Sequence, residues 1–319
     1  MFTAGNADAP SIAPDKFRDP DVTAKGEERA VVALTRLRTL WFNTGSLCNI
    51  SCANCYMEST PKNDSLIYLS RGEVETYLDE IDREGLAVEE IAFTGGEPFM
   101  NPDLIDMLTL ALRRDYRVLV LTNAMKPLHH KMNALLDLKR RYGERLALRV
   151  SIDHFTPRQH EEVRGEKTWQ PMLTGLKWLA DNGFNLTVAG RTCWDEQDEI
   201  SRAGYRDLFD AENIPVDATN PVALVLFPEM DSKLDVPEIT SRCWNILGVE
   251  PESMMCATSR MVVKGRGRAH PHVMPCTLLP YDSGFELGPD LASSSKPIKL
   301  NHPHCAKFCV LGGASCSAG

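Results

Sequence analysis

The chain carries three cysteines in one short stretch, Leu47-Cys48-Asn49-Ile50-Ser51-Cys52-Ala53-Asn54-Cys55-Tyr56. Their C-x₃-C-x₂-C spacing places three thiols on one loop, and thiolates are the ligands of iron–sulfur clusters. A structural zinc site needs a fourth ligand, and the next candidates, His129 and His130, lie far downstream. The spacing therefore favours a four-iron cluster with one iron left open for chemistry. A zinc knuckle, or three unrelated cysteines, are the alternatives.

A second motif follows the next apolar run, in the stretch Ala92-Phe93-Thr94-Gly95-Gly96-Glu97-Pro98. Two glycines allow a backbone to approach a ligand closely, and the Glu97 carboxylate can accept hydrogen bonds from a cationic amine. Alone, the motif is also compatible with an ordinary strand-to-helix turn. Its position, one strand–helix unit after the three cysteines, favours a ligand-binding strand end.

Short apolar runs alternate with longer amphipathic ones through most of the chain. The expected strands are Leu40–Asn43, Glu90–Phe93, Val118–Leu121, Leu146–Ser151, Asn185–Ala189 and Ala223–Phe227. The expected helices are Arg71–Glu84, Pro102–Arg114, Leu128–Tyr142, Trp169–Asn182 and Asp195–Ala211. Ser70 and Glu73 form the pattern of a capping box, Asn101-Pro102 suits a helix start, and Gly183 suits a helix end. Such alternation predicts an α/β fold with parallel strands, and six units fit a partial barrel better than a short open sheet.

Together these residues resemble the radical S-adenosylmethionine (radical SAM) superfamily over about residues 40 to 230. Cys48, Cys52 and Cys55 match its cluster motif, and Gly95, Gly96, Glu97 and Pro98 match its segment for binding the methionine amine. Further strand-end residues resemble those that contact the rest of the cofactor in the family: Thr122, Asn123, Ser151, Asp153 and Arg191. Asn54 departs from the pattern, since the family usually has an aromatic residue there; here Tyr56 follows the third cysteine instead.

The resemblance implies a fold and a reaction. The fold is a partial (β/α)₆ TIM-like barrel, with the motifs at the carboxyl ends of successive strands, where barrel enzymes place their sites. The reaction is reductive cleavage of SAM, by an electron from a four-iron cluster, to a 5′-deoxyadenosyl radical that abstracts a hydrogen atom from the substrate. An electron donor such as flavodoxin or ferredoxin would then be a partner.

The last part of the chain is rich in Gly, Pro, His and Ser and holds six of the ten cysteines. Its cysteines are Cys243, Cys256, Cys276, Cys305, Cys309 and Cys316. A cysteine, a glycine-bearing hairpin, a Pro-Cys pair and a late cysteine group resemble the auxiliary-cluster domains of the SPASM and twitch type. We expect one auxiliary 4Fe–4S cluster, with ligands Cys256, Cys276, Cys305 or Cys309, and Cys316. A zinc ribbon or buried thiols are the alternatives, and His302 and His304 are expected to be surface residues.

These observations predict three parts: a flexible N-terminal arm over residues 1–35, a radical SAM barrel over 36–240 and a twitch-like domain over 241–319. The net charge of −9 argues against general nucleic-acid binding, which depends on Lys and Arg contacts to phosphate. No apolar run is long enough to span a bilayer and no signal-peptide pattern opens the chain, so we expect a cytoplasmic protein.

Which substrate the radical attacks is less constrained. Because only a short segment precedes the first strand, we expect a small-molecule substrate, with the auxiliary cluster assisting oxidation or substrate binding. A peptide-modifying enzyme is the alternative, and a non-catalytic metal-binding scaffold is a second one.

Overall fold

The computed structural model describes residues 11–229, 231 and 233–313. Its centre is an eight-stranded sheet in the order β7-β6-β5-β4-β3-β2-β8-β9. Six of these strands are parallel to one another and follow the chain order: β2 (Thr39–Asn43), β3 (Glu90–Thr94), β4 (Arg117–Thr122), β5 (Leu146–Ser151), β6 (Asn185–Arg191) and β7 (Leu224–Phe227). The predicted partial (β/α)₆ barrel is confirmed.

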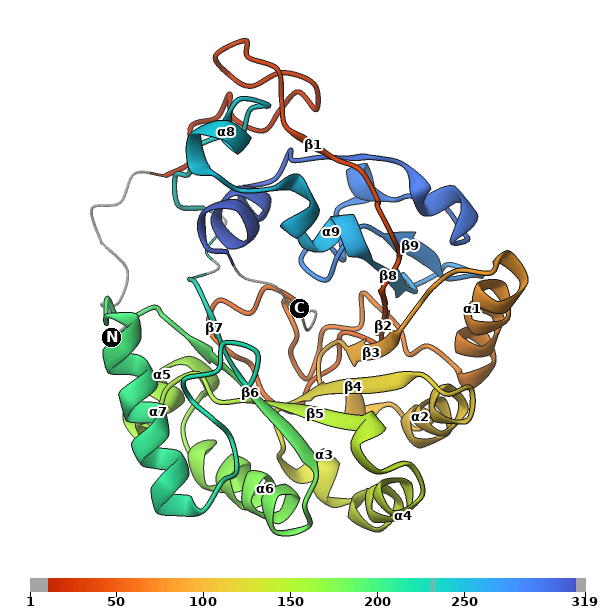
Figure 1. Cartoon of the computed structure of the whole chain (residues 1–319), viewed down its shortest axis with the longest axis vertical. Coiled ribbons are helices and arrows are strands. Elements are labelled where there is room, and N and C mark those ends of the chain that lie inside the picture. The colour runs from red at the N-terminus through yellow and green to blue at the C-terminus, as the bar shows by residue number, and fades with distance from the viewer. Residues whose placement is uncertain (1–10, 230, 232, 314–319) are drawn as a thin grey trace.

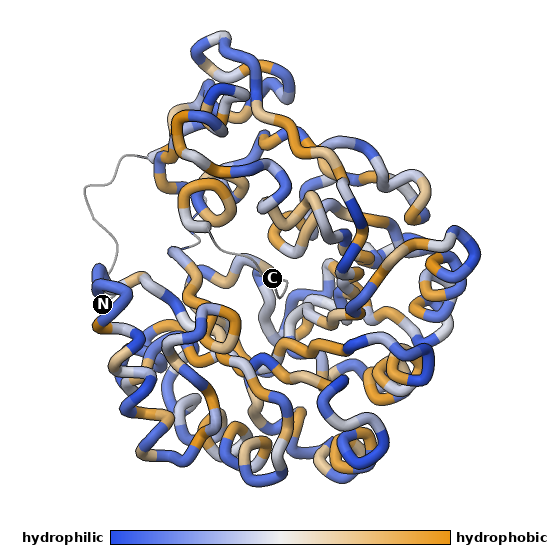
Figure 2. The backbone as a smooth tube through the Cα atoms, viewed as in Figure 1, coloured by the Kyte–Doolittle hydropathy of each residue, from blue (hydrophilic) through white to orange (hydrophobic). Residues whose placement is uncertain are grey.

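The helices lie mainly around the outside of these strands (Figure 1). Their bounds are α1 (Arg71–Glu84), α2 (Leu104–Arg113), α3 (Lys126–His129), α4 (Met132–Tyr142), α5 (Pro157–Arg164), α6 (Trp169–Asp181), α7 (Asp198–Glu212), α8 (Cys243–Leu247) and α9 (Met255–Thr258). Along the tube in Figure 2, the residues of the central strands are mostly hydrophobic, whereas hydrophobic and hydrophilic residues alternate along the outer helices. Strands β2 and β3 are buried along their whole length, as expected for a parallel sheet covered on both faces.

Local signals explain where several helices begin and end. The predicted capping box is present at α1: Ser70 accepts from the Glu73 main chain while Glu73 accepts from the Ser70 main chain. The predicted start at Asn101-Pro102 is wrong, because α2 begins at Leu104. Asn101 is fully buried and its side-chain amide donates to the carbonyls of Thr44 (3.1 Å) and Leu69 (2.9 Å), so it holds two loops together.

Two helical stretches differ further from the prediction. The expected helix Leu128–Tyr142 is divided into α3 and α4, and α5 was not expected at all. Helix α5 is strongly polar, and only His160 and Val163 are buried in it. It therefore lacks the apolar periodicity from which amphipathic helices are predicted.

The C-terminal part continues the same sheet. Strand β8 (Ser259–Val263) pairs parallel with β2, and β9 (His272–Met274) pairs antiparallel with β8. The glycine-bearing hairpin expected after Cys256 is thereby confirmed, but its pairing with the first barrel strand was not predicted. The barrel and the C-terminal segment consequently share one sheet and one continuous apolar core.

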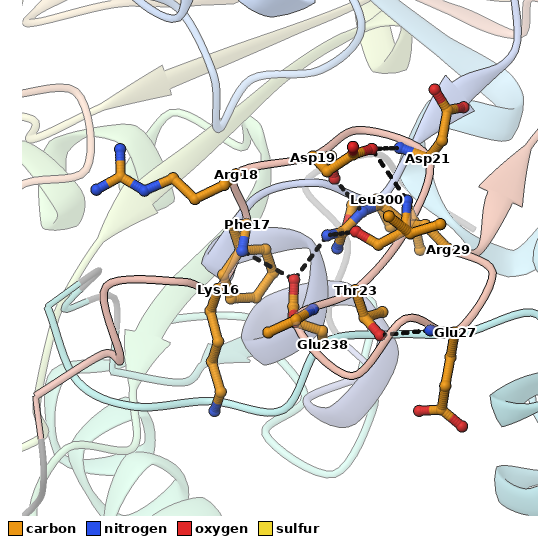
Figure 3. Close-up of polar contacts among 12 residues, drawn as sticks. Lys16, Phe17, Arg18, Asp19, Asp21, Thr23, Glu27, Arg29, Glu238 and Leu300 are labelled. Carbon is orange, nitrogen blue, oxygen red and sulfur yellow. Dashed lines mark hydrogen bonds and ion pairs between the residues drawn. The ribbon is translucent and has the colours of Figure 1, made fainter.

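The N-terminal segment has defined partners from Ser11 onward. Strand β1 (Val31–Val32) pairs with β10 (Ile298–Lys299). Just before it, the buried guanidinium of Arg29 donates to Glu238 at 2.6 Å and to the carbonyls of Asp19 and Val22 (Figure 3). The described part of the arm, expected to be flexible, is thus tied to the segment that follows the barrel.

Candidate functional site

One cavity lies at the carboxyl ends of the barrel strands. It encloses about 950 Å³, including the part open to solvent, which is the size of a pocket for a cofactor or drug-sized ligand. Its lining includes all but Glu97 of the residues that the sequence assigned to the first cluster and SAM: Cys48, Cys52, Cys55, Gly95, Gly96, Pro98, Thr122, Asn123, Ser151, Asp153 and Arg191. Tyr56 also lines it.

The cysteine loop is anchored at several points. Cys48 donates its main-chain N–H to Thr60 (3.1 Å), and Ala53 donates to Val163 (2.7 Å). The side-chain amide of Asn123 lies 3.9 Å from the Cys48 sulfur. Burial raises the pKa of Cys48 to about 12 and that of Cys52 to about 11. Such thiols become thiolates when a positive metal centre lies beside them.

The two glycines were expected to let the backbone approach a ligand, but in the structure they let it approach another part of the chain. A Cβ at Gly96 would lie 2.1 Å from the Leu47 carbonyl oxygen, and a Cβ at Gly95 would lie 2.5 Å from the Gly45 oxygen. Gly95 also has φ +141, a backbone conformation that glycine adopts without strain. The pair therefore lets the end of β3 pack directly against the backbone that leads into Cys48.

Glu97 does not line the cavity in this structure. Its carboxylate accepts from the Thr122 hydroxyl (2.9 Å), the Asn123 main chain (2.8 Å) and the Phe99 main chain (3.2 Å). Burial raises the pKa of Glu97 to about 7, and these three donors act against that rise. Because the Glu97 carboxylate accepts hydrogen bonds from Thr122 and Asn123 at the end of β4, it connects the end of β3 to the end of β4.

Asp153 is held by a residue that the sequence analysis missed. Arg164, at the end of α5, donates to both carboxylate oxygens of Asp153 at 3.0 Å. The Asp153 side chain is buried, at 5% exposure, and that of Arg164 is 15% exposed. Burial raises the pKa of Asp153, but Arg164 and Arg191 outweigh it and hold the pKa below its usual range. Arg191 also donates to the Asn54 carbonyl at 2.9 Å, so this cluster supports the cysteine loop.

Aromatic residues close the side of the cavity that faces the C-terminal segment. Phe227 ends β7, and Phe308 lies in the π-helical segment η6 (Cys305–Leu311). Their ring centroids are 5.2 Å apart, and both rings line the cavity. Neither residue was predicted, because β7 and η6 are brought together only by the tertiary fold.

A second, apolar cavity gathers cysteines of the C-terminal segment. Cys256, Cys276, Cys305 and Cys309 line it together with His304. Cys316, the remaining predicted ligand, lies outside the described residues. His304 was expected at the surface but is 6% exposed, and its buried Nδ1 has no hydrogen-bond partner among the described residues. Burial lowers the pKa of His304 to about 4, so its ring is neutral.

Comparison with known proteins places this arrangement in a family. The family model described as the radical SAM superfamily matches residues 42–203, which is half of the chain and contains both motifs. This chain belongs to the radical SAM superfamily.

Three curated relatives match over the barrel. AlbA of Bacillus subtilis, an antilisterial bacteriocin subtilosin biosynthesis protein, is 30% identical over 166 residues, covering 50% of this chain and 35% of AlbA. The GTP 3′,8-cyclase of Shewanella denitrificans is 25% identical over 47% of this chain and 42% of its own length. Mycofactocin maturase MftC of Mycobacterium ulcerans is 24% identical over 43% of this chain and 35% of MftC. The matches thus span less than half of each relative.

Solved structures show the same fold over a larger part of the chain. SuiB of Streptococcus suis bound to S-adenosylmethionine gives a TM-score of 0.58 at 12% identity, covering 80% of this chain and 63% of SuiB. The enzyme anSMEcpe with bound AdoMet gives 0.56 at 13% identity, covering 85% of this chain and 82% of that one. At these identities the likeness concerns the fold alone.

The residues of the first cavity fit the cofactors of the superfamily, SAM and a 4Fe–4S cluster. In the described part of the chain, no three His, Cys, Asp or Glu side chains are arranged to hold a single metal ion, as a closed zinc site requires. A cluster bound by three thiolates distributes its ligands over separate irons, which suits three thiols around one cavity. When bound, the two cofactors supply a 5′-deoxyadenosyl radical. As a radical SAM protein the chain is an enzyme and not a scaffold.

No helix within the described residues is long and apolar enough to cross a membrane.

Proposed function

We propose that this radical SAM enzyme oxidises its substrate with the help of an auxiliary 4Fe–4S cluster in the second cavity. The observation that carries the proposal is the position of η6. Phe308 of this segment lines the first cavity, whereas Cys305 and Cys309 line the second. One short segment therefore forms the wall between the radical site and the four gathered thiols.

The ligands that we propose for the auxiliary cluster are the four cysteines that line the second cavity. The sequence left Cys305 and Cys309 as alternatives and added Cys316, whereas here Cys305 and Cys309 both line the cavity. Four thiolates are a complete set for such a cluster. When bound, the cluster supplies an electron acceptor close to the substrate.

For the first cavity, we propose that Cys48, Cys52 and Cys55 hold the SAM-binding cluster. The backbone of Gly95, Gly96 and Pro98 would bind the methionine end of the cofactor. The other polar residues of the lining would position the remainder of SAM: Thr122, Asn123, Ser151, Asp153 and Arg191. Glu97 would act indirectly, by fixing the ends of β3 and β4. The aromatic wall of Phe227 and Phe308 would exclude water from the radical.

For the substrate, we propose a peptide. AlbA is named for the biosynthesis of the bacteriocin subtilosin, and MftC is named as a mycofactocin maturase. SuiB, whose fold matches most of this chain, has been solved with its precursor peptide SuiA. The small-molecule substrate that the sequence analysis expected, with a peptide as its alternative, keeps the support of the GTP 3′,8-cyclase match. We further propose a cytoplasmic location, where thiols stay reduced, with a flavodoxin or ferredoxin as electron donor.

A fractionation experiment tests the substrate class. The reconstituted enzyme, with dithionite and SAM, is mixed under anaerobic conditions with size-fractionated extract of the organism that encodes it, and 5′-deoxyadenosine is measured. We expect stimulation by a peptide fraction, lost after that fraction is digested with a protease. Stimulation confined to protease-resistant small molecules would replace the peptide by a small-molecule substrate.

A variant experiment tests the oxidative role. Cys276→Ala should abolish the product while slow, uncoupled formation of 5′-deoxyadenosine continues, because the first cavity is left intact. Full product formation by a variant lacking the auxiliary cluster would contradict the proposal.

A further inference from the structure

Arg260 is a fully buried cation that is hydrogen-bonded to Cys256, one of the residues that line the second cavity. It lies in β8 with 0% exposure. Its guanidinium donates to main-chain carbonyls only: Cys256 at 2.6 Å, Ser259 and Ser294 at 2.8 Å, and Lys296 at 3.4 Å. Within the described residues no carboxylate forms an ion pair with it. These neutral acceptors satisfy its hydrogen bonds but leave its positive charge uncompensated.

Another buried arginine, Arg29, has its positive charge balanced by a carboxylate. Arg29 is 1% exposed and also donates to main-chain carbonyls, but it has the Glu238 carboxylate at 2.6 Å (Figure 3). A buried charge without an opposite charge is costly, and a guanidinium does not lose its proton at physiological pH. Arg260 therefore has no compensating carboxylate among residues 11–229, 231 and 233–313, and a negative charge of another kind beside it would stabilise it.

The ionisable groups beside Arg260 are the cavity thiols. Its Nη1 bonds the carbonyl of Cys256, whose side chain lines the second cavity. Cys276, the other thiol that interacts electrostatically with Arg260, lines the same cavity. The negative charge that matches Arg260 is thus expected in the cavity itself.

We infer that Arg260 is the built-in counter-charge of the auxiliary cluster and sets its reduction potential. This inference rests on the proposed function. The reduced cluster carries one more negative charge than the oxidised cluster, so a fixed positive charge nearby favours the reduced form. Arg260 does not line the first cavity, and it acts as a positioning residue through the cluster.

The test measures the reduction midpoint potential of the auxiliary cluster in the full-length chain. A background with Cys48, Cys52 and Cys55 replaced by Ala leaves only this cluster visible by electron paramagnetic resonance. Arg260→Met removes the charge and Arg260→Lys retains it. Arg149→Met is the control, because Arg149 is a buried arginine of β5, and three strands of the sheet separate β5 from β8. We expect a more negative potential for Arg260→Met, a potential close to the parent for Arg260→Lys, and no shift for Arg149→Met.

Iron content separates the possible failures. If Arg260→Met takes up no cluster while Arg260→Lys does, the charge requirement is supported directly. An unchanged potential in Arg260→Met, or equal shifts or equal loss of iron in the Met and Lys variants, would overturn the inference and leave the auxiliary cluster in place. A background protein that binds no iron would instead overturn the auxiliary cluster, and this inference with it.

Discussion

Gly96 occupies a position where even a methyl group has no room. A Cβ there would lie 2.1 Å from the carbonyl oxygen of Leu47, the residue before the first cluster cysteine. The obstacle is backbone, so it cannot move without displacing the loop. We expect Gly96→Ala to lose most of the iron of the first cluster, measured as iron per chain after anaerobic reconstitution. Gly72→Ala is the matched control, because a Cβ at Gly72 meets no atom within 4 Å. Full iron in Gly96→Ala would show that the loop does not depend on this contact.

The Asp153–Arg164 pair lines the same cavity as Gly96. Replacing Asp153 by Asn leaves the buried Arg164 cation without its partner, and breaking a buried pair in this way costs about 3–5 kcal/mol. We expect that loss in the free energy of unfolding of Asp153→Asn, measured by denaturant titration. The double variant Asp153→Asn/Arg164→Gln should recover part of it. A loss below about 1 kcal/mol, as for an exposed pair, would contradict the burial of this pair.

The sequence indicated which residues lie together around a cavity better than it indicated the directions of their side chains. The cysteines and the polar strand-end residues lie around one cavity because parallel strands bring their carboxyl ends to one edge. Glu97 was expected to face a ligand but is directed at the end of β4. Arg164 was missed because its side chain is placed by α5, a helix without an apolar stripe. The direction of a side chain at a strand end depends on tertiary packing, and the spacing of residues in the sequence does not indicate that packing.

Among the elements of the described residues, η6 contributes to both cavities: Phe308 lines the first, and Cys305 and Cys309 line the second. Truncating Phe308, which is 2% exposed, removes the aromatic part of the wall between the two cavities. We expect Phe308→Ala to release severalfold more 5′-deoxyadenosine per product formed, because water and solvent hydrogen donors reach the radical. Phe308→Leu, which keeps most of the volume, should remain closer to the parent. The measurement is the ratio of the two products by chromatography, and an unchanged ratio in the Ala variant would exclude this role for the wall.

The N-terminal segment depends on Glu238 in a pH-dependent way. Burial raises the pKa of Glu238, but hydrogen bonds from the Ala24 main chain, Arg29 and the Phe17 main chain outweigh it, and the pKa lies below its usual range. A lowered carboxylate pKa stabilises the fold above the unfolded-state value of about 4.3, and this stabilisation disappears as the pH falls through the lower folded-state value. We therefore expect residues 11–30 to lose amide protection from hydrogen exchange as the pH is lowered below about 4.

Two variants check this pH dependence. In Glu238→Gln the segment should exchange rapidly already at neutral pH, with little further change in acid. Asp235→Asn removes the more exposed ion pair with Lys16 and should cost less than about 1 kcal/mol. If Glu238→Gln kept the acid-dependent loss of the parent, another group would be responsible.

The sheet shows which elements a sequence can reveal. Strands β2 to β7 follow from buried apolar runs between amphipathic helices, and the predicted bounds agree with the structure within two residues. The hairpin of β8 and β9 was expected from its glycines. The pairing of β8 with β2 was not expected. That contact joins residues about two hundred positions apart in the sequence, and the sequence of neither strand indicates which strand it pairs with.

At the scale of the whole molecule, one core supports two cysteine sites. Strand β8 is hydrogen-bonded to β2. The chain runs from β2 into the loop that carries Cys48, and it enters β8 shortly after Cys256. The two cavities are nevertheless lined by different thiols, and none of the described residues appears in both linings. Removing the ligands of one cluster should therefore leave the other cluster bound.

Iron stoichiometry tests this independence. The anaerobically reconstituted chain should bind about eight irons, the content of two four-iron clusters. Replacing Cys48, Cys52 and Cys55 by Ala should reduce the content to about four, as should replacing Cys276 and Cys305. The first variant should lose SAM cleavage altogether, and the second should retain slow cleavage, because its first cavity is untouched. Four irons in the parent would mean that the second cavity holds no cluster, since the first cysteine loop carries the family motif. Complete loss of iron in either variant would instead show that the shared core couples the two sites.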